Sequence, residues 1–394
     1  MEFLMNRIRL TRIILLFITL FPLLLNSCTE KDTVQSDKKE TLSVSEKKED
    51  EGILLRIMIF SAYAPEKYVA AFEKSMSDKY GIPVEIKIDF INNHDDYYDP
   101  IRSGSTDIVV LSHHIFKDER FNYITKGLLS PINLKNIPNA EHLAPELLNA
   151  DYHRIGDTLY GIPVANGPYG LAYNTLKFEN PPKSWQIFWD PAYRKSYVLS
   201  RYEYLYNINI TALAMGYAQE EISSYDLLNN PNFKKKLSEL TGNAHSFWEG
   251  VDTAEALYGH SIATAWGDSF SGLKERGEEW RMGFPEEGCL WWIDDFALTK
   301  AVETNPLKKQ LAEEWINKAL SQEYQLENIA RTVGTYPVIT NLTALLSEEE
   351  TDRFFSMETE AFFDSHILQS TITERDRNGL KLLWEEAIKA GREP

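Results

Sequence analysis

The sequence predicts an α/β fold built on a mainly parallel sheet. Residues 53–60 form a short apolar run typical of a buried strand, and residues 63–79 repeat apolar side chains at helical spacing, with Pro65 near the start. Residues 84–90 alternate in polarity, and residues 107–111 form another apolar strand. This strand–helix–strand rhythm is the pattern of α/β domains with a parallel sheet.

The second half of the chain carries the same kinds of element. Apolar runs predict strands at residues 197–200 and 261–266, and amphipathic or glycine-terminated stretches predict helices at residues 208–216 and 306–321. With 394 residues, of which 43% are hydrophobic, the chain is long enough to build about two domains.

The N-terminal segment has the features of a secretory signal. A basic stretch, residues 7–12, precedes an apolar run at residues 13–25 that is too short to span a bilayer comfortably. The run ends at Leu25-Asn26-Ser27-Cys28, which resembles the lipobox of bacterial lipoproteins. That resemblance implies a lipoprotein signal peptide at residues 1–27 and lipidation of Cys28. The alternative is a plain signal peptide that ends near a cysteine.

The residues that follow are highly charged. Residues 28–52 are rich in Lys, Glu, Asp and Ser, which predicts a solvated tether between the lipid anchor and the folded part. Cys289 is the other cysteine in the sequence, so a lipidated Cys28 leaves the monomer without a disulfide. The formal net charge of −18 argues against nucleic acid as a partner and suits cationic ligands weakly.

The predicted sheet also indicates where a ligand would bind. In open α/β sheets, ligands bind beyond the carboxyl ends of the strands. The segments expected there are residues 60–63, residues 112–114 and the loop after Phe90.

Several separated motifs resemble one known family. Residues 284–298 (FPEEGCLWWIDDFAL) and 333–337 (VGTYP) resemble the second crossover of the bacterial spermidine/putrescine-binding proteins and its sequel. Residues 159–163 (LYGIP) resemble the first crossover, residues 185–193 (WQIFWDPAY) another family segment, and residues 61–63 (SAY) the segment after the first strand. The motifs occur in the family's order.

The resemblance implies a two-lobed type II periplasmic binding protein whose α/β lobes are joined by crossover hinge strands. Lobe one would comprise residues 53–164 and 294–339, and lobe two residues 165–293 and 340–394. The implied function is that of the lipid-anchored substrate-binding component of an ABC importer, on the periplasmic or extracellular face of the membrane. It would capture a polyamine in the interlobe cleft and pass it to a membrane permease. We expect a monomer without a cofactor.

A polyamine requires carboxylates for its ammonium groups and aromatic faces for its methylenes. Asp294 is the expected ammonium partner, with Trp292 on the same strand face, whereas Asp295 points to the other face and is expected to be structural. Trp266 matches the family's aromatic wall, and Asp268 beside it has no family match. The residues implied to bind ligand are Phe60, Ser61, Tyr63, Ser112, His113, Glu203, Tyr206, Trp266, Trp292, Asp294 and Tyr336.

The sequence departs from the family pattern in three places. Glu203 aligns with the first acid of the lobe-two pair, but Tyr206 stands where the second acid is expected. Phe60 stands in place of a tryptophan, and Ser112-His113-His114 stands where the family has a Ser-x-Tyr segment after its third strand. Because one carboxylate of the family pattern is absent, a ligand with fewer positive charges, such as another small amine, is an alternative to a polyamine.

Other functions are less well supported. Adjacent histidines on a strand point apart, and no cysteine or carboxylate cluster accompanies His113 and His114, so we expect no metal site. The sequence contains no Gly-x-Ser-x-Gly, Walker or His-Glu-x-x-His motif, so we expect no enzyme and no catalytic residues. A sensory receptor on the same fold remains an open alternative.

Overall fold

A computed structural model describes residues 52–91, 94–355 and 366–391. The predicted signal peptide, Cys28 and the tether as far as residue 51 lie outside these described residues. Among the helices that are described, none combines the length and the apolar character needed to cross a membrane.

The N-terminal part forms the predicted parallel strands. β1 (Ile53–Ile59) pairs in parallel with both β2 (Val84–Phe90) and β3 (Ile108–Ser112). α1 (Glu66–Tyr80) connects β1 to β2 and ends at Gly81, whose φ of 67° is the left-handed conformation that glycine adopts readily. These elements confirm the predicted strand–helix–strand unit to within a few residues.

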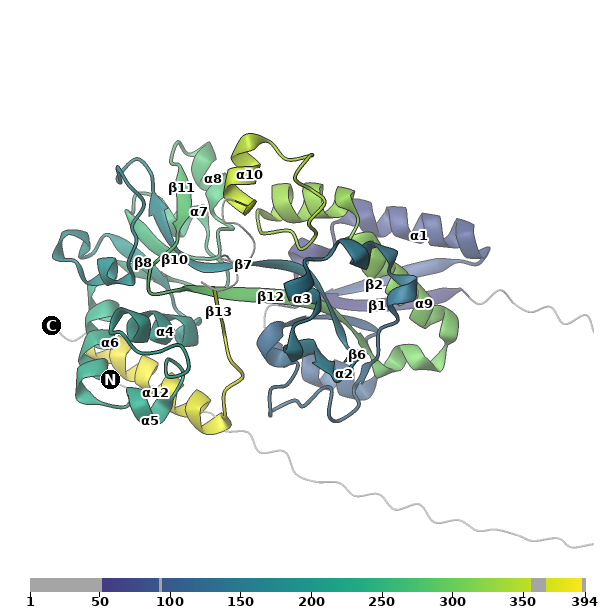
Figure 1. The fold of residues 1–394 in the computed structure, drawn as a ribbon, viewed down its shortest axis with the longest axis horizontal. Coiled ribbons are helices and arrows are strands. Elements are labelled where there is room, and N and C mark those ends of the chain that lie inside the picture. The colour runs from purple at the N-terminus through teal and green to yellow at the C-terminus, as the bar shows by residue number, and fades with distance from the viewer. Residues whose placement is uncertain (1–51, 92–93, 356–365, 392–394) are drawn as a thin grey trace, which may run out of the picture. The chain divides into compact units, whose positions relative to one another are not determined.

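Two long strands form the centre of the sheet. β7 (Gly161–Asn174) and β12 (Cys289–Thr299) pair antiparallel along most of their length, and β12 also pairs antiparallel with β3. Figure 1 shows these two strands side by side through the middle of the fold. The sheet is therefore mixed, which corrects the prediction of a mainly parallel sheet.

The second half of the sheet continues from β7. β10 (Ile262–Ala265) pairs antiparallel with β7 and parallel with β8 (Tyr197–Ser200), which pairs in parallel with β9 (Ser246–Trp248). The strand order is β2-β1-β3-β12-β7-β10-β8-β9. β11 (Trp280–Gly283) adds to β7, while β4 (Leu129–Ser130) and β13 (His366–Leu368) add to β12.

Helices and short turns complete the described part. A separate small ribbon joins β5 (Arg154–Ile155) to β6 (Thr158–Leu159). The other α-helices are α2 (Tyr98–Ser103), α3 (Pro145–Leu148), α4 (Tyr204–Ala214), α5 (Tyr225–Leu228), α6 (Pro231–Asn243), α7 (Ala254–Leu257), α8 (Phe270–Glu275), α9 (Pro306–Ala319), α10 (Glu348–Phe355) and α12 (Glu374–Ala390). A π-helix spans Tyr324–Val333, and 3₁₀ turns at Ser61–Tyr63, His94–Tyr97 and His113–Ile115 follow β1, β2 and β3.

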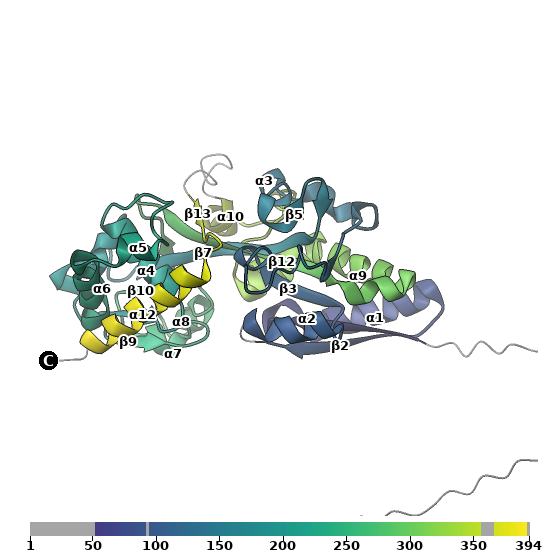
Figure 2. The ribbon, with the colours of Figure 1, turned by 90° about the horizontal axis from the view of Figure 1, so that it is seen from below.

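Buried side chains gather in two large cores. One surrounds β1 and includes Trp315 of α9, and the other surrounds β8 and β10 and includes Trp384 of α12. Figure 2 shows α1 and α9 beside the first group of strands and α4, α6 and α12 beside the second. Leu342 and Phe354 pack in the first core. The domain boundaries themselves stay a prediction.

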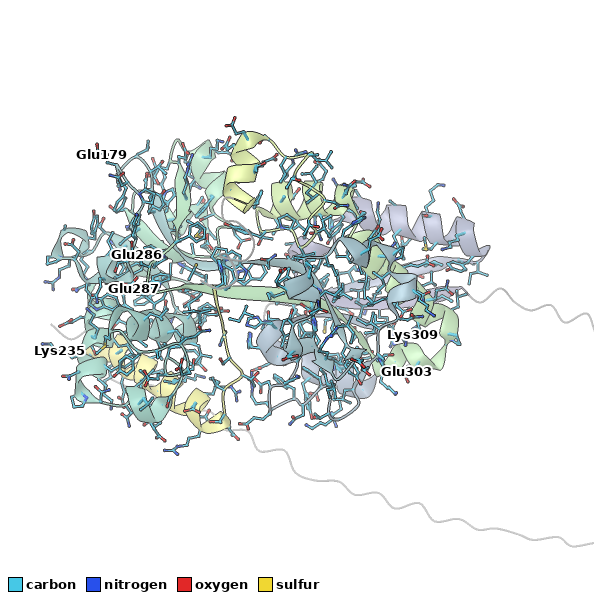
Figure 3. All side chains as sticks on the ribbon, in the orientation of Figure 1. Glu179, Lys235, Glu286, Glu287, Glu303 and Lys309 are labelled. Atoms are coloured by element: carbon cyan, nitrogen blue, oxygen red, sulfur yellow. The ribbon has the colours of Figure 1, made fainter. Side chains whose placement is uncertain are left out.

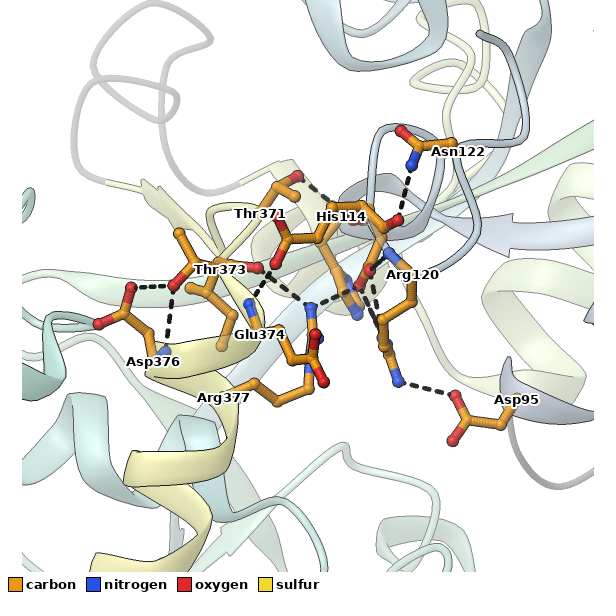
Figure 4. A network of polar contacts seen from close by, with 12 residues as sticks. Asp95, His114, Arg120, Asn122, Thr371, Thr373, Glu374, Asp376 and Arg377 are labelled. Carbon is orange, nitrogen blue, oxygen red and sulfur yellow. Dashed lines mark hydrogen bonds and ion pairs between the residues drawn. The ribbon is translucent and has the colours of Figure 1, made fainter. Parts of the chain in front are cut away.

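Charged side chains lie mainly on the surface, as Glu179 and Lys235 illustrate (Figure 3). One polar network joins the loop after β3 to the start of α12 (Figure 4). The nearly buried carboxylate of Asp118 accepts hydrogen bonds from the guanidinium groups of Arg120 and Arg377, each at 3.0 Å. The Thr371 hydroxyl donates to the carbonyl oxygen of His114 at 3.3 Å. These bonds hold the segment that enters α12 against the end of β3.

Candidate functional site

Asp294 is the centre of the candidate site. It lies on β12, and only 7% of its surface is exposed. Its carboxylate accepts a hydrogen bond from the Tyr63 hydroxyl at 2.9 Å and one from the Ser112 hydroxyl at 2.5 Å. Tyr63 follows β1 and Ser112 ends β3, so the carboxyl ends of two neighbouring strands meet at one acid.

The turn after β2 reaches the same point. Nε2 of His94 lies 3.0 Å from the Ser112 hydroxyl oxygen. Because that hydroxyl already donates to Asp294, the imidazole must donate its Nε2 proton to the serine. Burial, followed by the charge of Arg120, lowers the pKa of His94 to about 4, which keeps the ring neutral. The segments predicted to lie at the ligand side of the sheet are thus brought together at Asp294.

The turn after β1, Ser61–Tyr63, is held in place by the π-helix. The Tyr324 hydroxyl donates to the backbone carbonyl of Tyr63 at 2.6 Å, and the Asn328 amide donates to the carbonyl of Ala62 at 3.1 Å. Both donors belong to the π-helix Tyr324–Val333, and both side chains reach the loop after β1. The backbone of the turn that carries Tyr63 is therefore held in place by the π-helix.

The buried acid at the centre forms no ion pair with a Lys or Arg that the structure describes. Burial raises the pKa of Asp294 to about 6, and the hydrogen bonds from Ser112 and Tyr63 limit the rise. A buried carboxylate is costly without a cation beside it.

Asp295, the next residue, faces the other way. A register shift in the β12–β7 pairing falls between the two acids. Asp295 is fully buried and accepts hydrogen bonds from the Tyr152 hydroxyl at 2.8 Å and from Nδ1 of His153 at 2.5 Å. Its bonding capacity is used within the fold, in agreement with the structural role that alternation along the strand predicts.

Aromatic rings stand next to Asp294. The ring of Trp292 packs edge-to-face on Trp266 at 6.2 Å, and Trp266 packs on Tyr206 at 5.4 Å. A Cβ atom at Gly167 would lie 3.0 Å from the Trp292 ring, so glycine at this position of β7 leaves room for the indole. The faces of such rings attract ammonium groups and cover methylenes.

A second acid lies at the start of α4. Glu203 is half-buried, and burial raises its pKa to about 7. Its carboxylate forms no hydrogen bond or ion pair with any residue that the structure describes. The pKa of Tyr206 is raised by burial and then by the charges of Glu203 and Asp294, which places this tyrosine near both acids.

Other predicted site residues occupy different positions. The Phe60 ring packs edge-to-face on His94 at 5.4 Å, and Ser61 is exposed. His113 accepts the Ile293 backbone N–H at its Nδ1 and contacts the Gln369 carbonyl at 3.1 Å through Nε2. These bonds join β12 to the segment after β13, and a direct ligand contact by His113 stays a prediction.

Tyr336 lies apart from the acids. Its ring packs on Trp291 at 5.0 Å and on Phe354 at 5.4 Å, whereas Asp294 and Trp292 occupy the other face of β12. Tyr336 is therefore not brought into the group around Asp294.

The two adjacent histidines also differ from expectation. They belong to a 3₁₀ turn rather than to a strand, and their rings lie 5.2 Å apart instead of pointing apart. In the described part of the chain, no three His, Cys, Asp or Glu side chains are grouped as metal ligands would be.

Sequence reasoning did not include His94 or Asp268 among the candidate site residues. His94 follows β2 in the loop that was expected at the ligand side, so its position was the available signal. Asp268 follows Trp266 by two residues, and its charge contributes to the raised pKa of Tyr63, after burial and the effects of Asp294 and Tyr324. No pattern in the sequence indicates that Asp268 and Tyr63 are close.

The chain is similar to proteins of one family. The sequence profile of the bacterial extracellular solute-binding protein family matches residues 103–365. The spermidine/putrescine-binding periplasmic protein 1 of Haemophilus influenzae is 19% identical over 309 residues, which cover 77% of this chain and 79% of that protein.

Solved structures share the fold. The spermidine/putrescine ABC transporter substrate-binding protein PotD of Streptococcus pneumoniae superposes with a TM-score of 0.69 at 20% identity, covering 86% of this chain and 99% of that one. The Atu4243-GABA receptor superposes with a TM-score of 0.60 at 16% identity, covering 86% and 98%. The predicted two-lobed α/β fold of periplasmic binding proteins is confirmed. The profile match extends over most of the sequence, and the chain belongs to the bacterial extracellular solute-binding protein family.

Proposed function

We propose that this protein is the lipid-anchored substrate-binding component of an ABC importer and that it captures a polyamine such as spermidine or putrescine. The observation that carries the proposal is Asp294, a buried acid without a cationic partner among the described residues, placed beside Trp292 and Trp266. The names of the curated relative and of the pneumococcal structure, which include spermidine and putrescine, support the same ligand class.

The proposed site matches the chemistry of a polyamine. One ammonium group would bind Asp294, whose hydrogen bonds from Tyr63 and Ser112 hold the carboxylate in a fixed orientation. The indole rings of Trp266 and Trp292 would cover the methylenes that follow. Glu203, which has no partner of its own among the described residues, would meet a further ammonium group. A charge-assisted hydrogen bond of this kind contributes about 1.5–3 kcal/mol.

One difference between this sequence and the family pattern favours a second ligand class. Tyr206 provides a hydroxyl where the family pattern has a carboxylate, which suits a ligand with a single cationic end. The structural similarity to a GABA receptor shows that this fold accommodates such a ligand in another protein. A small amine or zwitterion is therefore the alternative, either for import or for sensing.

Thermal unfolding of the full chain in detergent distinguishes these ligands. We expect saturating spermidine or putrescine to raise the melting temperature by a few degrees, because a ligand that binds only the folded state stabilises it by RT ln(1 + [L]/Kd). Sodium chloride at the same ionic strength is the control for electrostatic screening by the added polyamine salt. A shift with GABA or another monoamine, and none with any polyamine, would show that the alternative is correct.

The proposed lipid anchor depends on Cys28, which lies outside the described residues. We expect the wild-type protein to incorporate labelled fatty acid in cells and to fractionate with membranes, because acyl chains on the N-terminal cysteine hold a protein at the bilayer. Cys28→Ser should abolish the labelling. Cys289→Ser is the matched control, since Cys289 is buried in the fold and should leave labelling unchanged. Equal labelling of the wild type and Cys28→Ser would exclude Cys28 as the acylation site.

A further inference from the structure

Two parts of the fold that belong to different groups of strands meet at Asp118. The loop after β3, residues 113–123, packs against β3, because Phe121 shares a buried cluster with Leu111. α12 packs in the second core, where Trp384 is buried. The loop and the helix are therefore each attached to their own group of strands, and contacts between them join the two groups.

One of these contacts is a largely buried ion pair. Nη2 of Arg377, in the first turn of α12, donates to Oδ2 of Asp118 at 3.0 Å, and the two side chains are 12% and 4% exposed. Beside it, the backbone N–H of Glu374 donates to the carboxylate of Glu119 (Figure 4). Hydrogen bonds between charged groups are stronger than neutral ones, and salt screens a buried pair much less than an exposed one.

This ion pair can break without leaving a buried charge unpaired. Arg120 donates to both carboxylate oxygens of Asp118, at 3.1 and 3.0 Å, and to Asp95 at 2.9 Å. A buried acid that loses its last partner is strongly destabilised, but Asp118 keeps Arg120 when Arg377 moves away. We therefore expect both cores to stay folded when the contact between Asp118 and Arg377 breaks.

Both ends of the ion pair are connected to the candidate site. The loop that carries Asp118 begins directly after Ser112, whose hydroxyl donates to Asp294. On the other side, the indole N–H of Trp384 in α12 donates to the backbone carbonyl of Arg201 at 2.9 Å, two residues before Glu203. The ion pair therefore links the segment that supports one acid of the site to the segment that carries the other.

We propose that the Asp118–Arg377 ion pair is a clasp that holds the two cores together beside the candidate site and slows the release of a bound ligand. If the cores separate, Glu203 moves away from Asp294, and a ligand that contacts both acids binds only the joined arrangement. The apparent dissociation constant is then the intrinsic one divided by the fraction of molecules in which the cores are joined. The effect on affinity rests on the proposed function, whereas the joining of the cores requires no ligand.

Arg377→Gln breaks the clasp, and Arg375→Gln is the matched control. The side chain of Arg375 is 72% exposed and pairs with Asp226 of α5, which packs in the same core as α12. Both variants remove one positive charge from the first turn of α12, but only Arg377→Gln breaks a contact between the cores. Arg377→Lys keeps the charge and should behave more like the wild type than Arg377→Gln does.

Pulsed electron paramagnetic resonance measures the separation of the cores without any ligand. Spin labels at Lys74→Cys on α1 and Lys235→Cys on α6 occupy exposed positions beside the first and the second core. The full chain also carries Cys28→Ser, so that the introduced cysteines are labelled while Cys289 stays buried. We expect Arg377→Gln to add a population at longer distances that the wild type and Arg375→Gln lack. A distribution that matches the wild type would overturn the inference, and so would an equal change in Arg375→Gln.

Calorimetry and dissociation rates of the full chain in detergent measure the effect on binding. We expect Arg377→Gln to weaken spermidine and putrescine binding by about ten-fold, the loss of one charge-assisted contact, mainly through faster dissociation. Longer distances combined with unchanged affinity would overturn the role of the clasp in ligand retention. A wild-type protein that binds no polyamine would contradict the proposed function, and the measured distances would still decide whether the clasp joins the cores.

Discussion

Replacing Asp294 by Asn is expected to weaken polyamine binding by about 10–100-fold, the largest loss expected from a single substitution in this protein. The variant removes the charge that an ammonium group would meet but keeps an oxygen that can accept from Tyr63 or Ser112. The loss should therefore appear in ligand affinity rather than in folding. Isothermal titration with spermidine and putrescine measures it directly.

The same substitution is expected to stabilise the ligand-free protein at pH 8. The pKa of Asp294 is raised by burial to about 6, so the charged form is less stable in the folded chain than in the unfolded chain. For an acid with a raised pKa, stability is fully present below the unfolded pKa and is lost as the pH rises through the folded value. Asn avoids this loss, and the stability difference from wild type should be about 1–3 kcal/mol at pH 8 and should shrink toward pH 5.

Opposite effects on affinity and stability distinguish a binding residue from a structural one. Glu275→Gln provides the control, because it makes the same change in net charge at an exposed position. An Asp294→Asn variant that is less stable than wild type at pH 8 would indicate that the hydrogen bonds of the carboxylate contribute more than its burial costs. Unchanged affinity would remove Asp294 from the site.

The part of the site formed by the loops after β1, β2 and β3 could largely be predicted, because it depends on local sequence pattern and on strand order. The apolar runs identified β1 and β3, alternation identified β2, and the position of ligands at the carboxyl ends of parallel strands identified the loops after them. Period-two alternation along β12 likewise separated Asp294 from Asp295. These features need only the sequence near each residue and the order of the strands.

The parts that could not be predicted depend on contacts between distant segments. Asp268 and Tyr63 lie about 200 residues apart in the sequence, and only the fold brings the charge of one to the hydroxyl of the other. Residues 112–114 were expected beyond the end of a strand, but no glycine or proline there indicated that His113–Ile115 forms a 3₁₀ turn. α4 begins at Tyr204, four residues before the predicted start. The sequence did not indicate this start, because the N-cap residue Glu203 makes no side-chain capping bond and gives no capping signature.

Polyamine affinity is expected to fall by at least about 100-fold between pH 8 and pH 5, since each required carboxylate costs up to ten-fold per pH unit below its pKa. Glu203 has a pKa raised to about 7 and Asp294 one raised to about 6, both mainly by burial. Both groups are charged at pH 8 and largely protonated at pH 5. Alkylammonium groups stay charged throughout this range, because the reference value for such amines is about 10. The change therefore comes from the protein and not from the ligand.

Titrations at pH 5, 6, 7 and 8 measure this dependence, and two variants assign it to residues. Because binding favours the charged carboxylates, each binding event should release protons near pH 6 to 7, and the measured heat should vary with the ionisation enthalpy of the buffer. Asp294→Asn should remove the part of the pH dependence that lies around pH 6, and Glu203→Gln the part around pH 7. An affinity that stays constant from pH 8 to pH 5 would mean that neither acid meets a cation. An exposed surface carboxylate titrates near pH 4. A polyamine affinity that changes between pH 5 and pH 8 would therefore identify the half-buried Glu203 and the buried Asp294 as the acids that hold the ligand.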